Sequence, residues 1–183
     1  MYYPLELILT MKQRFMMQNL KPKDITFYFD LDNTLCLFSV HGKEKEALES
    51  MYQPGFYENL EMLDDGIKVI PVLQAIGFKV KILTSCIDSE YCKPEKINWV
   101  KKFLPFFKEE DIILCENGVS KTTYVDNIEQ SILVDDYGKN LMQWIEAGGY
   151  AIKKSYSNKK RNIDSVKNHV EIFKILYDLK VLS

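Results

Sequence analysis

The sequence predicts an α/β fold, namely a doubly wound parallel sheet with helices on both faces, arranged in three layers. Short runs of β-branched, aliphatic and aromatic residues alternate along the chain with amphipathic segments of helical period. This alternation is typical of parallel strands joined by right-handed helical crossovers. The 183 residues, 46% of them hydrophobic, suffice for one domain with a buried core. We therefore expect a single domain over residues 1–183, without internal repeats.

Five apolar runs bounded by turn residues are the predicted strands, and they cover residues 25–30, 78–83, 111–115, 131–134 and 150–153. Four amphipathic segments are the predicted helices, over residues 64–76, 94–104, 140–147 and 164–180. Gly77 and the pair Gly148–Gly149 follow two of these helices, where glycine commonly ends a helix. Pro71 is expected in the first turn of its helix or slightly inside it, where proline is tolerated.

Two further segments are predicted to be helical additions to the sheet. Residues 3–19 predict an amphipathic helix packed on the domain or on a partner, and packing on the domain is favoured. An insertion at about residues 38–66 begins with a polar run and continues with apolar residues at helical spacing. It predicts a small helical cap over the ligand-binding end of the sheet. The alternative is a plain connection with one extra turn.

Composition limits the partners and the location of the protein. A formal net charge of −2 argues against a general nucleic-acid or membrane-surface binder, and Lys153–Lys154 with residues 159–161 is the candidate basic surface. No apolar stretch is long enough to cross a bilayer, and the N-terminus lacks the layout of a signal peptide. The four cysteines lack CxxC spacing and are expected to be buried, reduced thiols, which favours a cytoplasmic location. The sequence leaves open whether the chain forms a homodimer.

Polar side chains follow four of the predicted strands, at or just beyond the point where each strand ends. Because the carboxyl ends of parallel strands lie along one edge of a sheet, these side chains should meet in one crevice. Carboxylates there would hold Mg²⁺, while hydroxyls and a lysine would bind the oxygens of a phosphate. The set predicts metal-assisted phosphoryl transfer, and it comprises Asp30, Asp32, Thr84, Ser85, Lys121, Asp135 and Asp136.

Plainer structural interpretations compete with this one. The two aspartates after the first strand could form an Asx-type turn, and the pair after the fourth strand could be a solvated turn. For the second pair, the buried strand before it favours a site. Lys96 rivals Lys121 as a phosphate-binding lysine, but it falls inside a predicted helix, where a solvated face is favoured.

In their order along the chain these residues resemble the four motifs of the haloacid dehalogenase-like (HAD) phosphatases. The matching stretches are Asp30–Thr34, the apolar run into Thr84, Lys121 and Ile132–Asp136. Within that superfamily the chain resembles the 5′(3′)-deoxyribonucleotidase group, through Thr84–Ser85, Tyr91–Cys92, Glu95–Lys96 with Trp99–Val100, Lys121–Thr122 and Asp135–Asp136. Two features depart from that group. Asn33–Leu37 replaces the usual Gly-Val-Leu-Ala-Asp, and the cap segment between Phe38 and Phe56 is shorter.

The resemblance implies a two-step mechanism and a role for each residue. Asp30 would be the nucleophile that forms an aspartyl-phosphate, and Asp32 would be the general acid and base. Mg²⁺ would be held by Asp30, the backbone carbonyl of Asp32 and Asp136, with Asp135 supporting or joining them. The phosphate would be bound by Thr84, the amide of Ser85 and Lys121. Phe38 matches a family aromatic residue that lies against the nucleobase.

Three functions compete. The first is Mg²⁺-dependent hydrolysis of a small phosphomonoester, for which a nucleoside 5′-monophosphate is the leading candidate and a non-nucleotide substrate the alternative. The second is a catalytically silent HAD-like module that binds a phosphorylated ligand or a protein through its apolar terminal helices. The third is a phosphotransferase or polynucleotide-end phosphatase, which the sparse basic residues disfavour. Because every catalytic position is filled, we favour the first.

Overall fold

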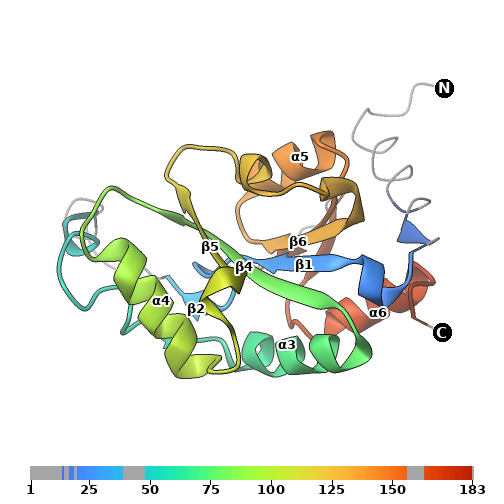
Figure 1. Ribbon diagram of the computed structural model, residues 1–183, viewed down its shortest axis with the longest axis horizontal. Coiled ribbons are helices and arrows are strands. Elements are labelled where there is room, and N and C mark those ends of the chain that lie inside the picture. The colour runs from blue at the N-terminus through green and yellow to red at the C-terminus, as the bar shows by residue number, and fades with distance from the viewer. Residues whose placement is uncertain (1–13, 15–16, 19, 39–47, 156–162, 183) are drawn as a thin grey trace.

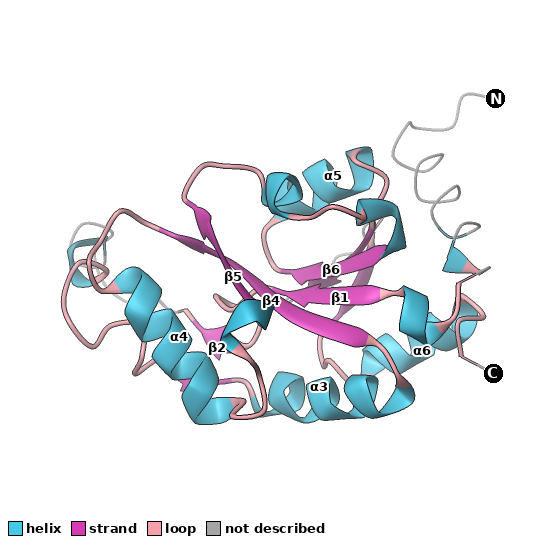
Figure 2. Cartoon of the chain, in the orientation of Figure 1, coloured by secondary structure: helices cyan, strands magenta, loops and turns pink. Residues whose placement is uncertain are grey.

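The structure, a computed structural model, describes residues 14, 17–18, 20–38, 48–155 and 163–182. Within these residues a six-stranded sheet runs through the molecule, and helices cover both of its faces (Figures 1 and 2). Every pair of neighbouring strands in this sheet is parallel. The predicted α/β fold with a doubly wound parallel sheet is therefore confirmed.

The strands of the sheet are β1 (Thr26–Phe29), β4 (Lys79–Cys86), β5 (Ile112–Glu116), β6 (Ser131–Asp135), β7 (Tyr150–Lys154) and β8 (Asp164–Val166). Their order across the sheet is β5-β4-β1-β6-β7-β8. The chain thus winds outward from β1 through β4 to β5, then returns to the other side of β1 and winds outward again. In open α/β sheets this reversal leaves a crevice at the carboxyl ends of the central strands, where ligands bind.

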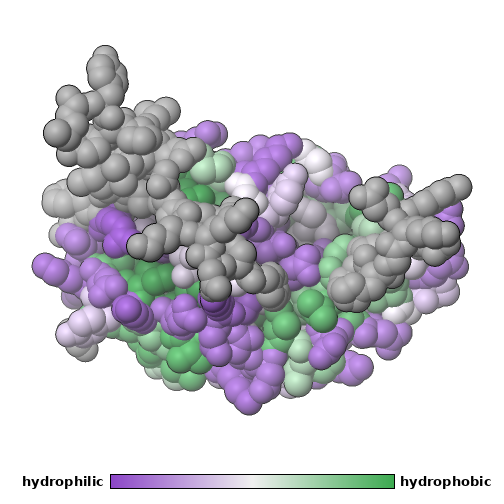
Figure 3. Space-filling model, turned by 180° about the vertical axis from the view of Figure 1, so that it is seen from behind, coloured by the Kyte–Doolittle hydropathy of each residue, from purple (hydrophilic) through white to green (hydrophobic). Residues whose placement is uncertain are grey.

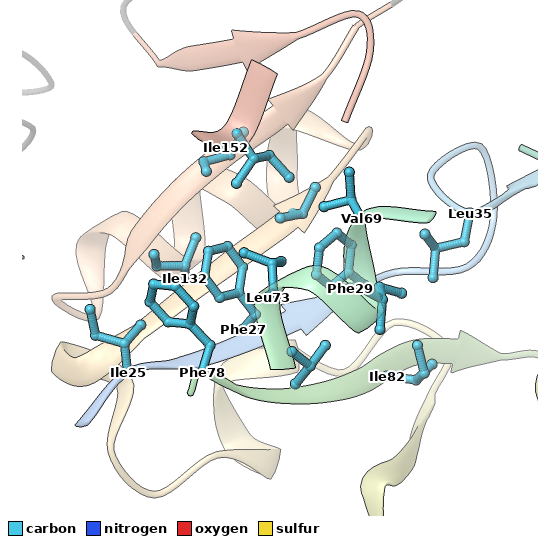
Figure 4. Close-up of a cluster of buried hydrophobic side chains, with 14 of the residues drawn as sticks. Ile25, Phe27, Phe29, Leu35, Val69, Leu73, Phe78, Ile82, Ile132 and Ile152 are labelled. Carbon is cyan, nitrogen blue, oxygen red and sulfur yellow. The ribbon is translucent and has the colours of Figure 1, made fainter. Parts of the chain in front are cut away.

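The two faces of β1 carry different side chains because successive residues of a strand point to opposite sides. Phe27 and Phe29 point into the larger core, which they share with Val69 and Leu73 of α3 (Asp64–Ile76) (Figure 4). Residues of α4 (Cys92–Phe103) and α6 (Glu171–Asp178) also belong to this core. Tyr28 points the other way and packs with Trp144 of α5 (Gly138–Glu146), with ring centroids 5.5 Å apart. The central strand is therefore buried on both faces.

The helix α3 begins at Asp64 and ends before Gly77, as predicted, and Gly77 adopts a left-handed conformation with φ 110°. Pro71, however, is the eighth residue of this helix and not part of its first turn. Its ring lies on the exposed side of the helix, so the hydrogen bond that it cannot donate is lost at a solvated position. The helix α4 also begins earlier than predicted, at Cys92 instead of residue 94.

The predicted helix over residues 164–180 is wrong in its first half. Asp164–Val166 forms β8, which pairs in parallel with β7, and α6 begins only at Glu171. Val166 is buried beside the sheet, whereas Ser165 is exposed. This alternation has the period of a strand, but over three residues it is too short to be distinguished from one turn of an amphipathic helix.

The segment predicted as a cap contains a feature that the sequence did not suggest. Two short antiparallel strands, β2 (Cys36–Leu37) and β3 (Glu61–Met62), pair with each other outside the main sheet. Residues 48–50 are helical, and residues 39–47 lie outside the described part of the chain. Most of the predicted N-terminal helix over residues 3–19 also lies outside it, although Met17 is described and is buried in the larger core.

Four short 3₁₀ helices complete the described structure, and they are η1 (Pro22–Asp24), η2 (Glu109–Asp111), η3 (Lys121–Tyr124) and η4 (Ile128–Gln130). Seen from behind, polar side chains are interspersed with apolar ones over the face that Figure 3 shows. Within the described residues, every helix falls short of the length and apolar character that crossing a bilayer requires.

Candidate active site

A tight turn presents Asp30 and Asp32 at the carboxyl end of β1. The amide of Asp30 donates to the carbonyl of Val134 (3.0 Å), which places Asp30 beside the end of β6. The carbonyl of Leu31 then accepts hydrogen bonds from three successive amides, those of Thr34, Leu35 and Cys36. Asn33 adopts a left-handed conformation with φ 53°, which asparagine tolerates better than most residues.

Three carboxylates meet where β1 and β6 end. Asp30, Asp135 and Asp136 each offer an oxygen, and these oxygens lie within 4.8 Å of one another. Burial raises the pKa of Asp136 to about 7, and the nearby charges of Asp30 and Asp135 add to the shift. Gathered carboxylates, two of them buried, repel one another unless a cation or protons neutralise them. Their oxygen ligands and geometry suit a hard divalent cation such as Mg²⁺.

Lys121 is buried between two of these carboxylates. Its Nζ lies 2.8 Å from Oδ1 of Asp30 and 2.7 Å from Oδ2 of Asp135. Burial alone would lower the pKa of Lys121, but the two carboxylates outweigh this effect and raise it. Lys121 is the first residue of η3, and the side chain of Ser120 caps that helix by accepting from the amide of Thr122. The structure thus brings Lys121 to the predicted crevice.

Asp135 has both oxygens engaged by the protein. Its Oδ1 accepts from the amide of Tyr137 (2.7 Å), and its Oδ2 accepts from Lys121 and from Nδ2 of Asn140 (2.9 Å). Asp135 is fully buried, and burial raises its pKa although Lys121 opposes the shift. These contacts make Asp135 better suited to orienting its neighbours than to binding a cation directly.

Lys96 is the residue on which the sequence interpretation was wrong. It was expected on a solvated face of α4, yet its side chain is 2% exposed and points into the site. Its Nζ donates to Oδ2 of Asp32 (2.6 Å), to Oγ1 of Thr84 (3.0 Å) and to the carbonyl of Ser85 (2.7 Å). The structure therefore brings two lysines to the site, one on each side.

A signal for the burial of Lys96 was present in the sequence. Cys92, Lys96 and Val100 are spaced four residues apart on α4, so they lie on one face of the helix, and all three are buried. A lysine between two apolar residues of a buried stripe needs an acidic partner. The partner is Asp32, whose distance in sequence hides the pairing.

The predicted phosphate-binding residues of β4 also lie at the site. Thr84 is fully buried at the end of the strand, and Ser85 lines a cavity of about 370 Å³. Asp30 and Asp136 also line that cavity, whereas the buried Asp135 does not, and the further lining includes Asn33, Asn117, Tyr137, Lys139 and Asn140. Asp32 lines the same cavity, so most of the residues predicted from the sequence share one crevice, while Thr84 and Asp135 are buried and are not part of its lining.

Phe38 does not line this cavity. It is half-buried and packs edge-on against Phe56 and parallel to Tyr57, with ring centroids 5.5 and 6.4 Å away. The ring of Tyr57 lies 5.3 Å from Nζ of Lys96, so this aromatic cluster adjoins the site through Tyr57. The predicted contact of Phe38 with a nucleobase stays a prediction.

Glu95 is a site neighbour that the sequence did not single out for a role. Its carboxylate is buried and accepts from the amides of Gly55 (2.5 Å) and Tyr57 (2.9 Å). It therefore ties the segment that carries the aromatic cluster to the same turn of α4 that carries Lys96. No short sequence motif indicates such a contact, because its partners are backbone amides about 40 residues away.

Known structures share this architecture. A HAD-superfamily hydrolase from Ehrlichia chaffeensis is similar over 88% of this chain and 99% of its own, with 16% identity and a TM-score of 0.59. A HAD hydrolase of family IA, variant 3, from Entamoeba histolytica matches 85% of this chain and 99% of its own, with 13% identity and a TM-score of 0.61. A HAD family hydrolase from Deinococcus radiodurans, with bound phosphate and sodium, matches 90% of this chain and 99% of its own at 11% identity and a TM-score of 0.59. At these identities the likeness establishes the fold.

The family follows from the sequence comparison. Residues 6–181 match the model of the family described as 5′ nucleotidase, deoxy (pyrimidine), cytosolic type C protein. No curated protein was found to be similar to the chain in sequence. The family match covers almost the entire chain, and the predicted HAD resemblance agrees with it. The chain therefore belongs to this 5′-nucleotidase family, and it is a phosphomonoester hydrolase with a HAD-like fold.

Proposed function

We propose that the protein hydrolyses a nucleoside 5′-monophosphate in a Mg²⁺-dependent reaction that proceeds through an aspartyl-phosphate on Asp30. The observation that carries this proposal is the gathering of Asp30, Asp135 and Asp136 around one point, with Asp32 and Lys96 beside them. The family match supports a nucleotide as the substrate. The phosphate bound to the Deinococcus radiodurans hydrolase is consistent with a phosphate site in this fold.

In the first step, a carboxylate oxygen of Asp30 attacks phosphorus while the bond to the leaving oxygen breaks. Asp32 gives its proton to that leaving oxygen. Burial and the charge of Asp30 raise the pKa of Asp32, whereas Lys96 lowers it, so the environment of Asp32 suits a group that exchanges protons. In the second step, Asp32 takes a proton from water as the water oxygen attacks phosphorus, which restores Asp30 and releases phosphate.

Mg²⁺, held by Asp30, Asp136 and the backbone carbonyl of Asp32, would offset the repulsion between the phosphate and the carboxylates when bound. Asp135 would support this shell, because its own oxygens are already hydrogen-bonded. Oxygen ligands of this kind and number are the ones that Mg²⁺ prefers.

Lys96 and Lys121 would divide two tasks. Lys96 lies against Thr84 and Ser85, so it would bind the phosphate together with the Thr84 hydroxyl and the Ser85 amide. Lys121 lies between Asp30 and Asp135, so it would orient the nucleophile. This proposal assigns phosphate binding to Lys96, whereas the sequence interpretation assigned it to Lys121.

The test is phosphate release from a panel of phosphomonoesters, with Mg²⁺ and with a chelator. We expect phosphate release in the presence of Mg²⁺ but not with the chelator. Asp30→Asn should abolish this release. Asp32→Asn should reduce it by about 10²–10⁴-fold, the usual contribution of general acid–base catalysis. Asp64→Asn, at an exposed position outside the site, should retain it. Full activity of Asp30→Asn would contradict the covalent mechanism. No release from any substrate, with ligand still bound, would favour a silent binding module.

We also propose a cytoplasmic location. Its support is that all four cysteines are free and buried, as expected for a protein from a reducing compartment. The word cytosolic in the name of the matching family agrees with it.

A further inference from the structure

The two sides of the candidate site differ in what surrounds them. Asp30 faces Lys121, Asp135 and Asp136, so its side is occupied by the carboxylate cluster. Asp32 faces Lys96 and the end of β4 instead. A general acid must reach the oxygen of the leaving group. If Asp32 has this role, the leaving group lies on the side of α4 and of the loop that joins β4 to it.

A second cavity opens on that side. It has a volume of about 820 Å³, more than twice that of the cavity around the carboxylates, at about 370 Å³. Asn117 lines both cavities, and its amide donates to the carbonyl of Cys86 (2.9 Å), which joins their walls. The second cavity is therefore adjacent to the reacting groups and large enough for a leaving group of nucleoside size.

The charge of this second cavity is unbalanced. Among the residues that the structure describes, its lining carries three carboxylates, those of Asp88, Glu90 and Glu116, and one ammonium group, that of Lys93. Within the described residues none of these three carboxylates forms an ion pair, although Glu90 accepts a hydrogen bond from the Tyr91 hydroxyl. All three are exposed to solvent. Their net effect is a negative field at the mouth of the cavity that a leaving group would enter.

We propose that this second cavity binds the leaving group and that its acidic wall selects for leaving groups without negative charge. The preferred substrates are monophosphates whose remaining part is neutral or cationic and offers hydroxyl or amino donors to the carboxylates of Asp88, Glu90 and Glu116. Monophosphates that carry a second phosphate or a carboxylate are disfavoured. This inference rests on the proposed function, because it assumes that Asp32 protonates the leaving group.

The test compares substrates that differ in the charge of the leaving group at nearly constant size. One series is 2-aminoethyl phosphate, 2-hydroxyethyl phosphate and phosphoglycolate, and the other pairs a nucleoside 5′-monophosphate with the matching 3′,5′-bisphosphate. We expect kcat/KM to be about tenfold lower for the anionic member of each series, given several exposed like charges. The ratio of kcat/KM for the uncharged substrate to kcat/KM for the anionic substrate should shrink as salt is added, because exposed charges are screened.

Variants assign the effect to the cavity wall. The triple variant Asp88→Asn, Glu90→Gln, Glu116→Gln should bring the ratio close to one, mainly by raising kcat/KM for the anionic substrates. Glu146→Gln removes one charge from the exposed end of α5, outside both cavities, and should leave the ratio unchanged. A merely structural role of the wall would change kcat/KM for every substrate by the same factor.

Three results overturn the inference in distinguishable ways. Equal kcat/KM for neutral and anionic substrates would show that the leaving group does not sense the acidic wall. A ratio that persists in the triple variant would place the selection elsewhere. Absence of phosphate release from every substrate would instead contradict the proposed function, and the inference would fall with it.

Discussion

Lys96 and Lys121 are each almost completely buried, and each is held in place by the carboxylates that it faces. Lys121 contacts Asp30 and Asp135, whereas Lys96 contacts Asp32. A buried ammonium group without a partner is costly, and so is a buried carboxylate, so each contact removes two penalties at once. The two lysines thus lower the cost of burying several aspartates at one site.

The proposed roles of these lysines predict different effects of the same substitution. Lys96→Met should weaken inhibition by inorganic phosphate by about 10–100-fold, the range expected for losing charged hydrogen bonds. Lys121→Met should instead mainly lower the thermal stability, because it leaves Asp30 and Asp135 buried without a cation. The measurements are the inhibition constant of phosphate and the unfolding temperature of each variant.

Lys102→Met is the matched control, since Lys102 is exposed on the same helix as Lys96 and contacts only the ring of Phe103 among the described residues, at 5.0 Å. It should change neither quantity appreciably. Unchanged phosphate inhibition in Lys96→Met would contradict the assignment of Lys96 to the phosphate.

The raised pKa of Asp136 leads us to expect that binding of the proposed cation depends on pH. Its pKa is raised to about 7, so the folded protein without a cation retains a proton that the unfolded chain has already lost. The corresponding stability is present at low pH and is lost as the pH rises through 7. In the proposed function, Mg²⁺ would bind the ionised carboxylate and would therefore compete with this proton. We therefore expect the dissociation constant of Mg²⁺ to be about tenfold larger at pH 6 than at pH 8.

Calorimetric titration of Mg²⁺ at both pH values measures this difference. Thermal unfolding with and without Mg²⁺ gives a second readout, in which Mg²⁺ should raise the unfolding temperature more at pH 8 than at pH 6. Groups that do not contact the cation affect the scans with and without Mg²⁺ equally, so they cancel in the difference at each pH. Equal affinities at the two pH values would show that the proton on Asp136 does not compete with the cation.

Among the elements, α4 links the site to the segment predicted as the cap. One turn of α4 carries Glu95, which accepts from the amides of Gly55 and Tyr57, and Lys96, which reaches Asp32. The centre of the Tyr57 ring lies 5.3 Å from the Lys96 ammonium, so the same segment also contacts the site directly. A movement of the loop at residues 55–57 would therefore directly change the surroundings of the Lys96 ammonium group.

Glu95→Gln should loosen this connection. An amide side chain offers one carbonyl oxygen where the carboxylate offers two, so one backbone amide is left without its partner, at a cost of about 1–3 kcal/mol. We expect faster hydrogen exchange at the amides of Gly55 and Tyr57 and little change elsewhere in the sheet. Glu109→Gln, an exposed carboxylate paired with Lys101, is the control and should leave these two amides protected. Unchanged exchange at both amides in Glu95→Gln would contradict the proposed link.

At the scale of the whole molecule, a buried polar network joins three elements that are distant in sequence. Asp65 at the start of α3 accepts from Lys154 of β7 (3.1 Å) and from the amide of His169 (2.8 Å), just before α6. Burial would raise the pKa of Asp65, but its hydrogen bonds with His169 and Lys154 bring it well below the usual range. The stability that Asp65 contributes is therefore present at neutral pH and is lost as the pH falls through the acidic range.

Removing the charge of Asp65 should destabilise the fold as a whole. Asp65→Asn leaves Lys154, whose side chain is 3% exposed, without its carboxylate, so we expect a loss of about 3 kcal/mol in the free energy of unfolding. The neighbouring change Asp64→Asn removes only an exposed pair with Lys68, one helical turn away, and should cost about 0.5 kcal/mol or less. Denaturant unfolding of both variants measures the difference. Similar losses would show that the buried network does not hold these elements together.

The residue pattern predicted the central strands closely because a strand buried on both faces must be a continuous apolar run. Predicted strands 111–115 and 131–134 match β5 and β6 to within a residue at either end. The short strand β8 and the pair of β2 with β3 were not predicted, because two or three residues carry too little periodicity. These short strands form only where a neighbouring segment supplies their hydrogen bonds.

Sequence alone was enough to establish the fold class and to place the aspartates, Thr84 and Ser85 at one edge of the sheet, because the direction of a parallel strand dictates where its last residues lie. The folded chain was needed to pair Lys96 with Asp32 and Lys121 with Asp30, and to reveal the contacts of Glu95 and Asp65. Periodicity states which residues share a face of a helix. It does not state what that face meets, because the way in which a helix crosses its sheet depends on packing between residues far apart in the chain.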